Sequence, residues 1–381
     1  MYFSWKYASS AAWGLWQWGG GLSGLGTQNE NFNSIQILRG LAALLVVIDH
    51  TLQHTLTDPP RILGVFGAFG VSIFFVISGF IIAYIHSGGF TPGNFMRRRI
   101  MRVVPLYWIC TLFLAVCAIV LPSLFKTTVF TPEYLLKSMA FLPMAVPGIP
   151  DDWRPLLKPG WSLNYEIFFY VLFSLFWWCR NGLQRTILMS SVLGGLVLGA
   201  FFVPRHGSVT AFYLNFNLMP FIAGMWIAEL QRRGVWARLS VHSLPVLVFA
   251  MLLGIATLFT VDFTQGPLFI EFLAYLIASV LLVITALCVE RWLHDLSPRN
   301  LLLLIGDSSY SLYLTHMFLV GAGWAVFNRL GLSEKAFPLA ATAIVIGSLV
   351  AARISYLVIE KPFTRLGSRR SQRKKVDMQP G

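Results

Sequence analysis

The sequence predicts an all-α fold, a polytopic bundle of about ten transmembrane helices, and its composition and hydropathy both indicate this. Of the 381 residues, 56% are hydrophobic and only 12% are charged, whereas soluble domains carry about 25% charged residues. The mean hydropathy is +0.68. A soluble fold of this composition would lack the polar surface that must face water. Apolar runs long enough to cross a bilayer also recur along the chain.

Ten apolar segments have the length of roughly 17–25 residues that a bilayer requires. Several contain Gly or Pro, which membrane helices tolerate better than soluble helices do. We expect the ten helices at residues 35–54, 65–86, 103–121, 161–179, 187–203, 211–230, 244–261, 267–289, 300–322 and 337–359.

Basic residues predict the orientation of these helices. If the N-terminus lies in the cytoplasm, most Lys and Arg residues between the helices fall on cytoplasmic segments, as the positive-inside rule requires. The C-terminus then also lies inside, and an odd number of spans would remove the bias. The net charge of +13 is therefore interpreted as topology and affinity for anionic headgroups or phosphates, and not as nucleic-acid binding.

The chain divides into three parts. We expect a membrane domain at residues 31–363 and a basic cytoplasmic tail at residues 364–381. Residues 1–30 hold several Trp residues and a Gly-rich run, without the charged region and continuous apolar stretch of a signal peptide. We interpret them as a disordered or interfacial leader, or as the product of a wrongly assigned start.

The four cysteines do not suggest a disulfide framework or a metal site. Cys110, Cys117, Cys179 and Cys288 all fall within or beside apolar runs. They form no CxxC pair, and no His stands at metal-ligand spacing from them. We interpret them as small apolar residues.

The first predicted helix contains charged residues, each of which would cost about 2.5–3.5 kcal/mol at the bilayer centre. Arg39 and His50 are separated by three turns plus roughly 20°, so both leave the same face, about 16 Å apart along the axis. Asp49 is rotated by about 100° and is expected to pack between helices. The pattern favours a polar track from the cytosol to a buried imidazole that acts as a base or nucleophile. The alternative is an arginine that snorkels to headgroups and a histidine that only bonds a neighbouring helix.

Glu166 is a second anomaly, near the outer end of the fourth predicted helix. His50 also lies in the outer half of its helix, so the two side chains could meet. The carboxylate would then orient the imidazole or hold an acceptor hydroxyl. The alternative is an interfacial glutamate that reaches water.

Four arginines lie between the second and third predicted helices, at positions 97, 98, 99 and 102. As a functional patch, Arg98, Arg99 and Arg102 would bind a polyanionic cytosolic ligand, because guanidinium groups match phosphate oxygens. As a stop signal for membrane insertion, the cluster needs no other purpose.

The ninth predicted helix carries a row of hydroxyl groups at residues 309–316 that ends in His316. Polar side chains inside a membrane bundle are expected to bond neighbouring helices or a substrate. We predict that Tyr310, Ser311 and His316 contact the substrate.

Six blocks together resemble the membrane-bound acyltransferase-3 family, particularly its exopolysaccharide and O-antigen O-acetyltransferases. The blocks occur in the family's order, and one block alone would mean little. They are residues 35–50, 74–80, 99–108, 161–170, 309–316 and 360–363.

The resemblance implies an O-acetyltransferase of the bacterial inner membrane. Such an enzyme would move an acyl group, expected to be acetyl, from cytosolic acyl-CoA to a hydroxyl of a cell-surface or exported polysaccharide or glycolipid. His50 corresponds to the catalytic histidine and Arg39 to its paired arginine. Arg99 and Arg102 correspond to a cytoplasmic contact with acyl-CoA, and Glu166 is assigned a supporting catalytic role. The resemblance implies neither a metal nor a tightly bound cofactor.

Two positions depart from the family pattern. Ser72 stands where relatives often carry an acidic residue, so any role of that carboxylate is missing. Ile167 follows Glu166 where many relatives have a second glutamate.

Two other classes of function remain open from the residues. Buried charges and helices interrupted by Gly or Pro are also typical of transporters and flippases. A membrane sensor or scaffold would use the same charges only to pack its helices. The residues also leave open whether His50 deprotonates the acceptor or carries the acyl group itself.

Overall fold

The computed structural model describes residues 32–54, 60–121, 128–203, 207–239, 243–262, 267–332 and 336–376. The predicted leader at residues 1–30 lies outside these ranges. Residues 33–381 group into one compact unit. Within the described ranges every regular element is a helix and no strand occurs.

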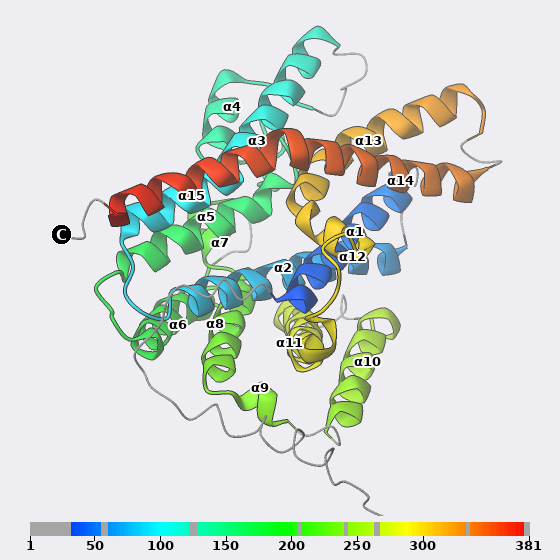
Figure 1. The fold of residues 1–381 in the computed structure, drawn as a ribbon. Coiled ribbons are helices and arrows are strands. Elements are labelled where there is room, and N and C mark those ends of the chain that lie inside the picture. The colour runs from blue at the N-terminus through cyan, green and yellow to red at the C-terminus, as the bar shows by residue number, and fades with distance from the viewer. Residues whose placement is uncertain are drawn as a thin grey trace, which may run out of the picture. The chain divides into compact units, whose positions relative to one another are not determined.

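The helices are named in chain order, as in Figure 1. They are α1 (Asn33–Gln53), α2 (Arg61–Ile85), α3 (Pro92–Val120), α4 (Pro132–Met139), α5 (Gly160–Leu175), α6 (Gly182–Gly199), α7 (Val209–Tyr213), η1 (Phe216–Leu218), α8 (Met219–Arg232), α9 (Val235–Arg238), α10 (Leu244–Thr260), α11 (Leu268–Leu293), α12 (Leu301–Asp307), α13 (Ser309–Arg329), α14 (Phe337–Ser355), the π-helical turn η2 (Tyr356–Glu360) and α15 (Lys361–Val376).

The predicted fold class is confirmed, because each of the ten predicted segments overlaps a helix. In the described part of the chain, eight helices are long and apolar enough to cross a membrane. Two predicted spans are shorter, with 16 residues in α5 and 17 in α10. Many large apolar side chains are exposed, among them Phe202, Val246 and Leu339. Apolar surface on this scale suits a multi-pass integral membrane protein whose outer face contacts lipid.

The third helix begins much earlier than predicted. Helix α3 starts at Pro92, with Thr91 as its N-cap, and not near residue 103. Proline suits the first helical position because its missing N–H would have no partner there. The arginines at 97–102 therefore lie on the first turns of a helix and not in a loop. Their helical phase decides which of them point into the protein.

The ninth predicted span is interrupted. It divides into α12 and α13 at Ser308. A Cβ atom added to Gly306, in the last turn of α12, would overlap the carbonyl oxygen of Gln36 in α1. The close approach of α12 to α1 thus requires glycine at this position. The break sets α13 in a new direction towards α1, α3 and α14.

Helix α2 packs closely against α1 and α8, as Figure 1 shows. At the crossing of α2 and α8, a Cβ on Gly79 would overlap the carbonyl oxygen of Phe221, and a Cβ on Gly224 would overlap that of Val76. Small residues let membrane helices approach each other closely. This crossing places Ser78, next to Gly79, on the wall of the cavity described below.

Helix α15 continues the chain beyond the last span and lies alongside α3 (Figure 1). Arg97 donates a hydrogen bond from Nη2 to the carbonyl oxygen of Gly367 (3.0 Å). The predicted tail at residues 364–381 is therefore helical as far as Val376. One arginine of the basic cluster on α3 is used for this contact.

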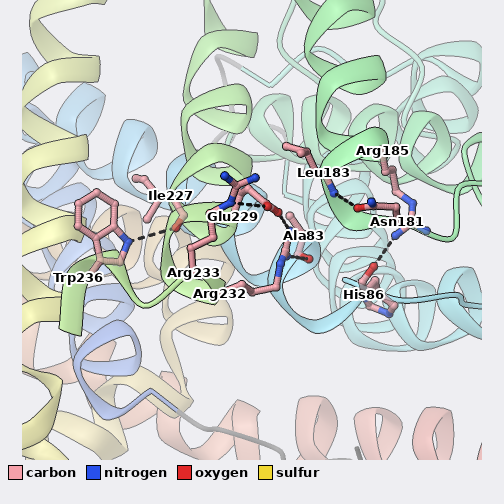
Figure 2. Close-up of polar contacts among 10 residues, drawn as sticks. All are labelled: Ala83, His86, Asn181, Leu183, Arg185, Ile227, Glu229, Arg232, Arg233 and Trp236. Atoms are coloured by element: carbon pink, nitrogen blue, oxygen red, sulfur yellow. Dashed lines mark hydrogen bonds and ion pairs between the residues drawn. The ribbon is translucent and has the colours of Figure 1, made fainter. Parts of the chain in front are cut away.

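A buried arginine joins the ends of α2, α5 and α6, and Figure 2 shows its contact with His86. Arg185 in α6 is 2% exposed and donates to four carbonyl oxygens, those of His86, Gly88, Phe176 and Cys179. These carbonyls lie at and just after the ends of α2 and α5. Carbonyl groups at a helix end have no hydrogen-bond partner within the helix. Arg185 is one of the basic residues between the predicted helices, and the structure gives it a structural role as well.

A second set of charges joins α8 to α2 (Figure 2). Glu229 accepts hydrogen bonds from Arg232 and from Arg233 (3.0 Å). Arg232 also donates to the carbonyl oxygen of Ala83 in α2 (2.8 Å). These contacts hold the two helices that cross at Gly79 and Gly224.

Candidate active site

Helix α13 connects most of the predicted site residues. Its first two turns, Ser309–His316, are buried except for Thr315, which is partly exposed. Five of the polar side chains on these turns bond other elements, two of them α1 and one each α3, α5 and η2. Ser309 accepts from Arg39 (3.0 Å), Tyr310 donates to the Val103 carbonyl (2.6 Å), Ser311 donates to Glu360 (2.7 Å), Tyr313 bonds Ser162 (2.7 Å), and His316 bonds His50 (3.3 Å).

The spacing of Arg39 and His50 predicts one shared face of α1, and this is confirmed. Both side chains reach α13, Arg39 at Ser309 and His50 at His316. Asp49, on another face, is buried and accepts a hydrogen bond from Gln53 (2.5 Å). Its carboxylate lies against Gly67 of α2, so it packs between helices as expected.

The two imidazole rings form a directed pair. His316 is fully buried, and its Nδ1 lies 3.1 Å from the Leu312 carbonyl oxygen. The Nδ1 of His50 lies 2.9 Å from the Val46 carbonyl and 3.3 Å from Nε2 of His316. A carbonyl can only accept, so each Nδ1 carries a proton in the neutral pair. The single Nδ1 proton of His50 is then shared between the Val46 carbonyl and the Nε2 of His316, and the Nε2 of His50 keeps a free lone pair.

This assignment gives His50 the tautomer that a general base requires. Among the described residues, its Nε2 has no hydrogen-bond partner. The backbone of α1 and the ring of His316 both hold the opposite nitrogen, so they orient the free one. His316 therefore positions His50.

A cavity with about 750 Å³ of empty space, part of it open, lies beside this pair. It is bounded by α1, α2, α3, α5 and α13. Five predicted site residues line it, namely Arg39, Arg99, Arg102, Glu166 and Tyr310. Four others do not, namely His50, Arg98, Ser311 and His316.

The charges around the cavity are predominantly positive. Arg39, Arg99 and Arg102 line it together with a single carboxylate, that of Glu166. Glu360, just behind the wall, interacts electrostatically with Arg102 and Arg39. Such a site favours an anionic ligand, because guanidinium groups bind phosphate or carboxylate oxygens with short charge-assisted bonds.

The three arginines differ in how far they are already bonded. Arg39 donates to Ser309. Arg99 lies over two aromatic rings, 5.8 Å from the centre of each, those of Phe95 and Tyr170. Arg102 makes no hydrogen bond to any described residue. Its donors are therefore available to a ligand in the cavity.

Glu166 is held by two hydroxyl groups. Ser78 of α2 donates to its Oε1 (3.0 Å), and Tyr170, one turn along α5, donates to the same oxygen. No hydrogen bond joins Glu166 to His50 in the described part of the chain. The meeting of these two groups, which the sequence suggested, is not observed, because Glu166 faces the cavity and His50 faces His316.

Tyr313 separates the cavity from the histidine pair. Its ring lines the cavity and lies 6.2 Å from that of His316, centre to centre. Its hydroxyl donates to the Pro159 carbonyl (2.9 Å) and bonds Ser162. The imidazole pair is thus one side chain away from the arginine-lined space.

Sequence reasoning missed four residues of this arrangement, Ser78, Tyr170, Tyr313 and Glu360. Tyr170 had a usable signal, because residues four apart on a helix are neighbours and Glu166 is four positions earlier. Ser78 and Glu360 lay inside the family-like blocks without an assigned role. Their partners are 88 and 49 residues away, and sequence spacing gives no access to such distances.

The segment between the third and fourth predicted helices lies outside on the predicted topology, and we call it the outer loop. Where it is described, it is built around α4. Tyr134 donates to the Arg154 carbonyl (2.5 Å), and Leu156 donates its N–H to Ser138 (2.9 Å). Burial alone would raise the pKa of Asp152, but hydrogen bonds and charge from Arg154 outweigh burial and hold that pKa below its usual value. The outer loop is therefore ordered where it is described, although it contains several prolines between residues 143 and 159.

Metal chemistry has no support in the described ranges, where no group of three or more His, Cys, Asp or Glu residues is placed to hold a metal ion. The four cysteines are free.

The amino-acid sequence is similar to those of known acyltransferases. A family model described as an acyltransferase domain (Acyl_transf_3) matches residues 32–357. The exopolysaccharide production protein ExoZ of Rhizobium meliloti is 35% identical over 315 residues, covering 80% of this chain and 92% of that protein. The acyltransferase MdmB of Streptomyces mycarofaciens is 26% identical, covering 88% and 92%.

A further relative is longer than this chain. The O-acetyltransferase OatA of Staphylococcus aureus is 26% identical over 366 residues, which is 87% of this chain and 57% of that protein. No solved structure matches. The family model spans both histidines and every residue that lines the cavity, so the chain belongs to the acyltransferase-3 family of membrane O-acyltransferases.

Proposed function

We propose that this O-acyltransferase moves an acetyl group from cytosolic acetyl-CoA to a hydroxyl of a polysaccharide or glycolipid at the outer face of the bacterial inner membrane. The observation that carries the proposal is the cavity lined by Arg39, Arg99 and Arg102 beside the oriented imidazole of His50. The relatives named for exopolysaccharide production and O-acetyl transfer support the choice of group and acceptor.

The phosphates of the donor would dock on the arginines. Arg102 offers free donors, and Arg39 and Arg99 add positive charge on neighbouring helices. On the predicted topology, these residues lie at the cytoplasmic ends of α1 and α3. The proposal therefore supplies the donor from inside the cell, where acyl-CoA is made.

In the chemical step, the acceptor oxygen would attack the thioester carbonyl while His50 Nε2 takes the hydroxyl proton. The acyl C–S bond breaks, a C–O ester bond forms, and the CoA thiolate leaves and takes up a proton. His316 keeps the Nδ1 proton of His50 in place through this transfer. Glu166, bonded to Ser78 and Tyr170, would orient the substrate within the cavity.

The same residues also allow a two-step route, in which His50 Nε2 first accepts the acyl group as an acyl-imidazole and then passes it to the acceptor. Rapid acid quenching of protein mixed with radiolabelled acetyl-CoA distinguishes the routes. If the protein becomes labelled and the acceptor then removes the label, the two-step route is supported. If the protein carries no label during turnover, direct transfer is supported.

The test of the function uses purified protein in lipid nanodiscs with acetyl-CoA. The acceptor is surface polysaccharide from the source cells after mild alkali has removed its O-acyl groups. We expect acceptor-dependent release of CoA and an acetyl ester on the glycan. His50→Ala should abolish both, while Arg98→Ala, which changes an exposed arginine outside the cavity, should retain them.

A transporter or flippase would move glycan without consuming acetyl-CoA, so this assay separates the two classes. Normal CoA release by correctly folded His50→Ala protein would overturn the proposed role of the imidazole. Glycan transport without CoA release would overturn the reaction itself.

A further inference from the structure

A second cavity, with about 700 Å³ of empty space, lies on the other side of α2. It is bounded by α2, α5, η1, α8 and α11. Its volume falls within the roughly 300–1,000 Å³ of small-molecule sites. Its aromatic and polar lining includes Trp161, Phe216, Asn217, Glu271, Phe272 and Tyr275. None of the residues assigned above to the donor or to the chemical step lines it.

The polar groups of this cavity are few, and two of them are unengaged. Glu271 makes no hydrogen bond or ion pair with any described residue, and the same holds for the indole N–H of Trp161. Ser72, by contrast, is satisfied within the protein, because it accepts from Ser279 (2.9 Å) and donates to the Tyr275 carbonyl. Glu271 is partly exposed, and its carboxylate is free to accept hydrogen bonds from a ligand that enters this largely aromatic space.

This combination fits a sugar ring. One face of a pyranose presents C–H groups, which pack against the negative face of an aromatic ring. Its hydroxyl groups donate to a carboxylate and accept from an indole N–H. A lipid tail would leave Glu271 unpaired.

The second cavity borders both the first one and the outer surface. Val71 and Phe75 line both cavities. Trp161 lines the second cavity and an open groove formed by Asp151, Trp153 and Lys158 of the outer loop. The rings of Phe75 and Trp161 meet edge to face, 6.3 Å apart. The three spaces therefore follow one another, separated by these two side chains.

The predicted topology gives this series a direction. The lining residues of α8 and α11 lie near the starts of these helices, and those of α2 lie in its middle. All three helices begin on the predicted outer side. The arginines of the first cavity come from the opposite side. An acceptor entering from outside and a donor entering from inside would thus approach the same partition.

We propose that the second cavity binds one hexopyranose unit of the acceptor, with Glu271 and Trp161 bonding its hydroxyl groups. The inference rests on the proposed function and names the acceptor site within it. Because Phe75 and Val71 line both the cavity and the donor space, the bound sugar would present its hydroxyl to the acyl group beside these two side chains.

The experiment compares Glu271→Gln and Trp161→Phe with two matched controls. Glu133→Gln removes an exposed carboxylate of α4, and Trp292→Phe alters an exposed tryptophan at the end of α11. Each variant is assayed for acetyl transfer to the alkali-treated polysaccharide, for KM of acetyl-CoA, and for slow release of CoA without acceptor. Acetyl content of surface polysaccharide from cells expressing each variant is measured as well.

We expect Glu271→Gln and Trp161→Phe to raise the KM for polysaccharide about 10- to 100-fold, as loss of one charge-assisted or directed hydrogen bond predicts. Their KM for acetyl-CoA and their acceptor-independent CoA release should match those of both controls. Cells carrying them at limiting expression should show the same loss of acetyl groups.

The inference is wrong if either cavity variant has the same KM for polysaccharide as its control. It is also wrong if the acetyl-CoA parameters change in parallel, which would indicate a general structural defect. These outcomes leave the function intact as long as His50→Ala abolishes transfer. Failure of the function itself would instead appear as active His50→Ala protein.

Discussion

Arg102→Ala offers the sharpest test of the donor site, because this side chain has no hydrogen bond to lose. It lines the cavity and makes no hydrogen bond to any described residue, and its interaction with Glu360 is electrostatic. One charge-assisted hydrogen bond contributes about 1.5–3 kcal/mol, and 1.4 kcal/mol corresponds to a factor of ten. Binding of acetyl-CoA should therefore weaken roughly 10- to 100-fold, with little change in kcat.

The assay measures equilibrium binding of radiolabelled acetyl-CoA to protein in nanodiscs, together with kcat and KM. Arg98→Ala is the matched control, since it removes the same charge from the same stretch of α3 outside the cavity. Acetyl-pantetheine, which lacks the phosphates, supplies the second control. Its kinetics should not respond to Arg102→Ala.

Three results would refute this reasoning. Equal weakening by Arg98→Ala and Arg102→Ala would mean that only net charge matters. A loss of kcat with unchanged binding would place Arg102 in the chemical step. An equal effect on acetyl-pantetheine would show that Arg102 does not contact phosphate.

Three further predictions concern positioning, stability and pH. His316→Gln should lower kcat by roughly 100-fold, within the range of general-base contributions, at unchanged KM for acetyl-CoA, and should alter the pH–rate profile; a fall in folded protein alone would contradict the positioning role. Arg185→Ala leaves four carbonyls without their partner, so we expect at least about 3 kcal/mol of destabilisation, seen as a lower thermal midpoint with normal kcat in the remaining folded protein. The pKa of Asp152 is lowered in the folded protein, so its bond to Arg154 stabilises the loop at every pH above about 3.9, the ordinary pKa of an aspartate. This stabilisation is lost as the pH falls through the lower pKa that Asp152 has in the folded protein. The amide hydrogen exchange of residues 144–158, corrected for the intrinsic pH dependence of exchange, should therefore be faster at pH 2 than at pH 6. Asp152→Asn should remove this difference.

The sequence alone determined the class of fold and the first half of the site. Hydrophobic length is a local property, so each of the ten predicted segments overlaps a helix. Helical periodicity is also local, and it placed Arg39 and His50 on one face before any contact was known. Residues with charges inside apolar runs were recognisable as candidates because lipid penalises them.

Helix ends were harder to predict from sequence. The predicted start of α3 lies after the cluster of arginines, whereas the helix begins before it. The error arises because a hydropathy window treats charged residues as the end of a span. The N-cap at Thr91 and the proline at position 92 mark the start of the helix. The consequence reaches the site, since the phase of α3 turns Arg99 and Arg102 inward and leaves Arg98 exposed.

Only the tertiary structure decided which polar groups meet. His50 bonds His316, which is 266 positions away, and not Glu166. Glu360 sits behind the arginines although its block suggested no role. Such pairs depend on where helices cross, and crossings depend on close contacts such as those of Gly79, Gly224 and Gly306. Periodicity shows which face of a helix a residue occupies, but the neighbour on that face is set by packing across the whole bundle.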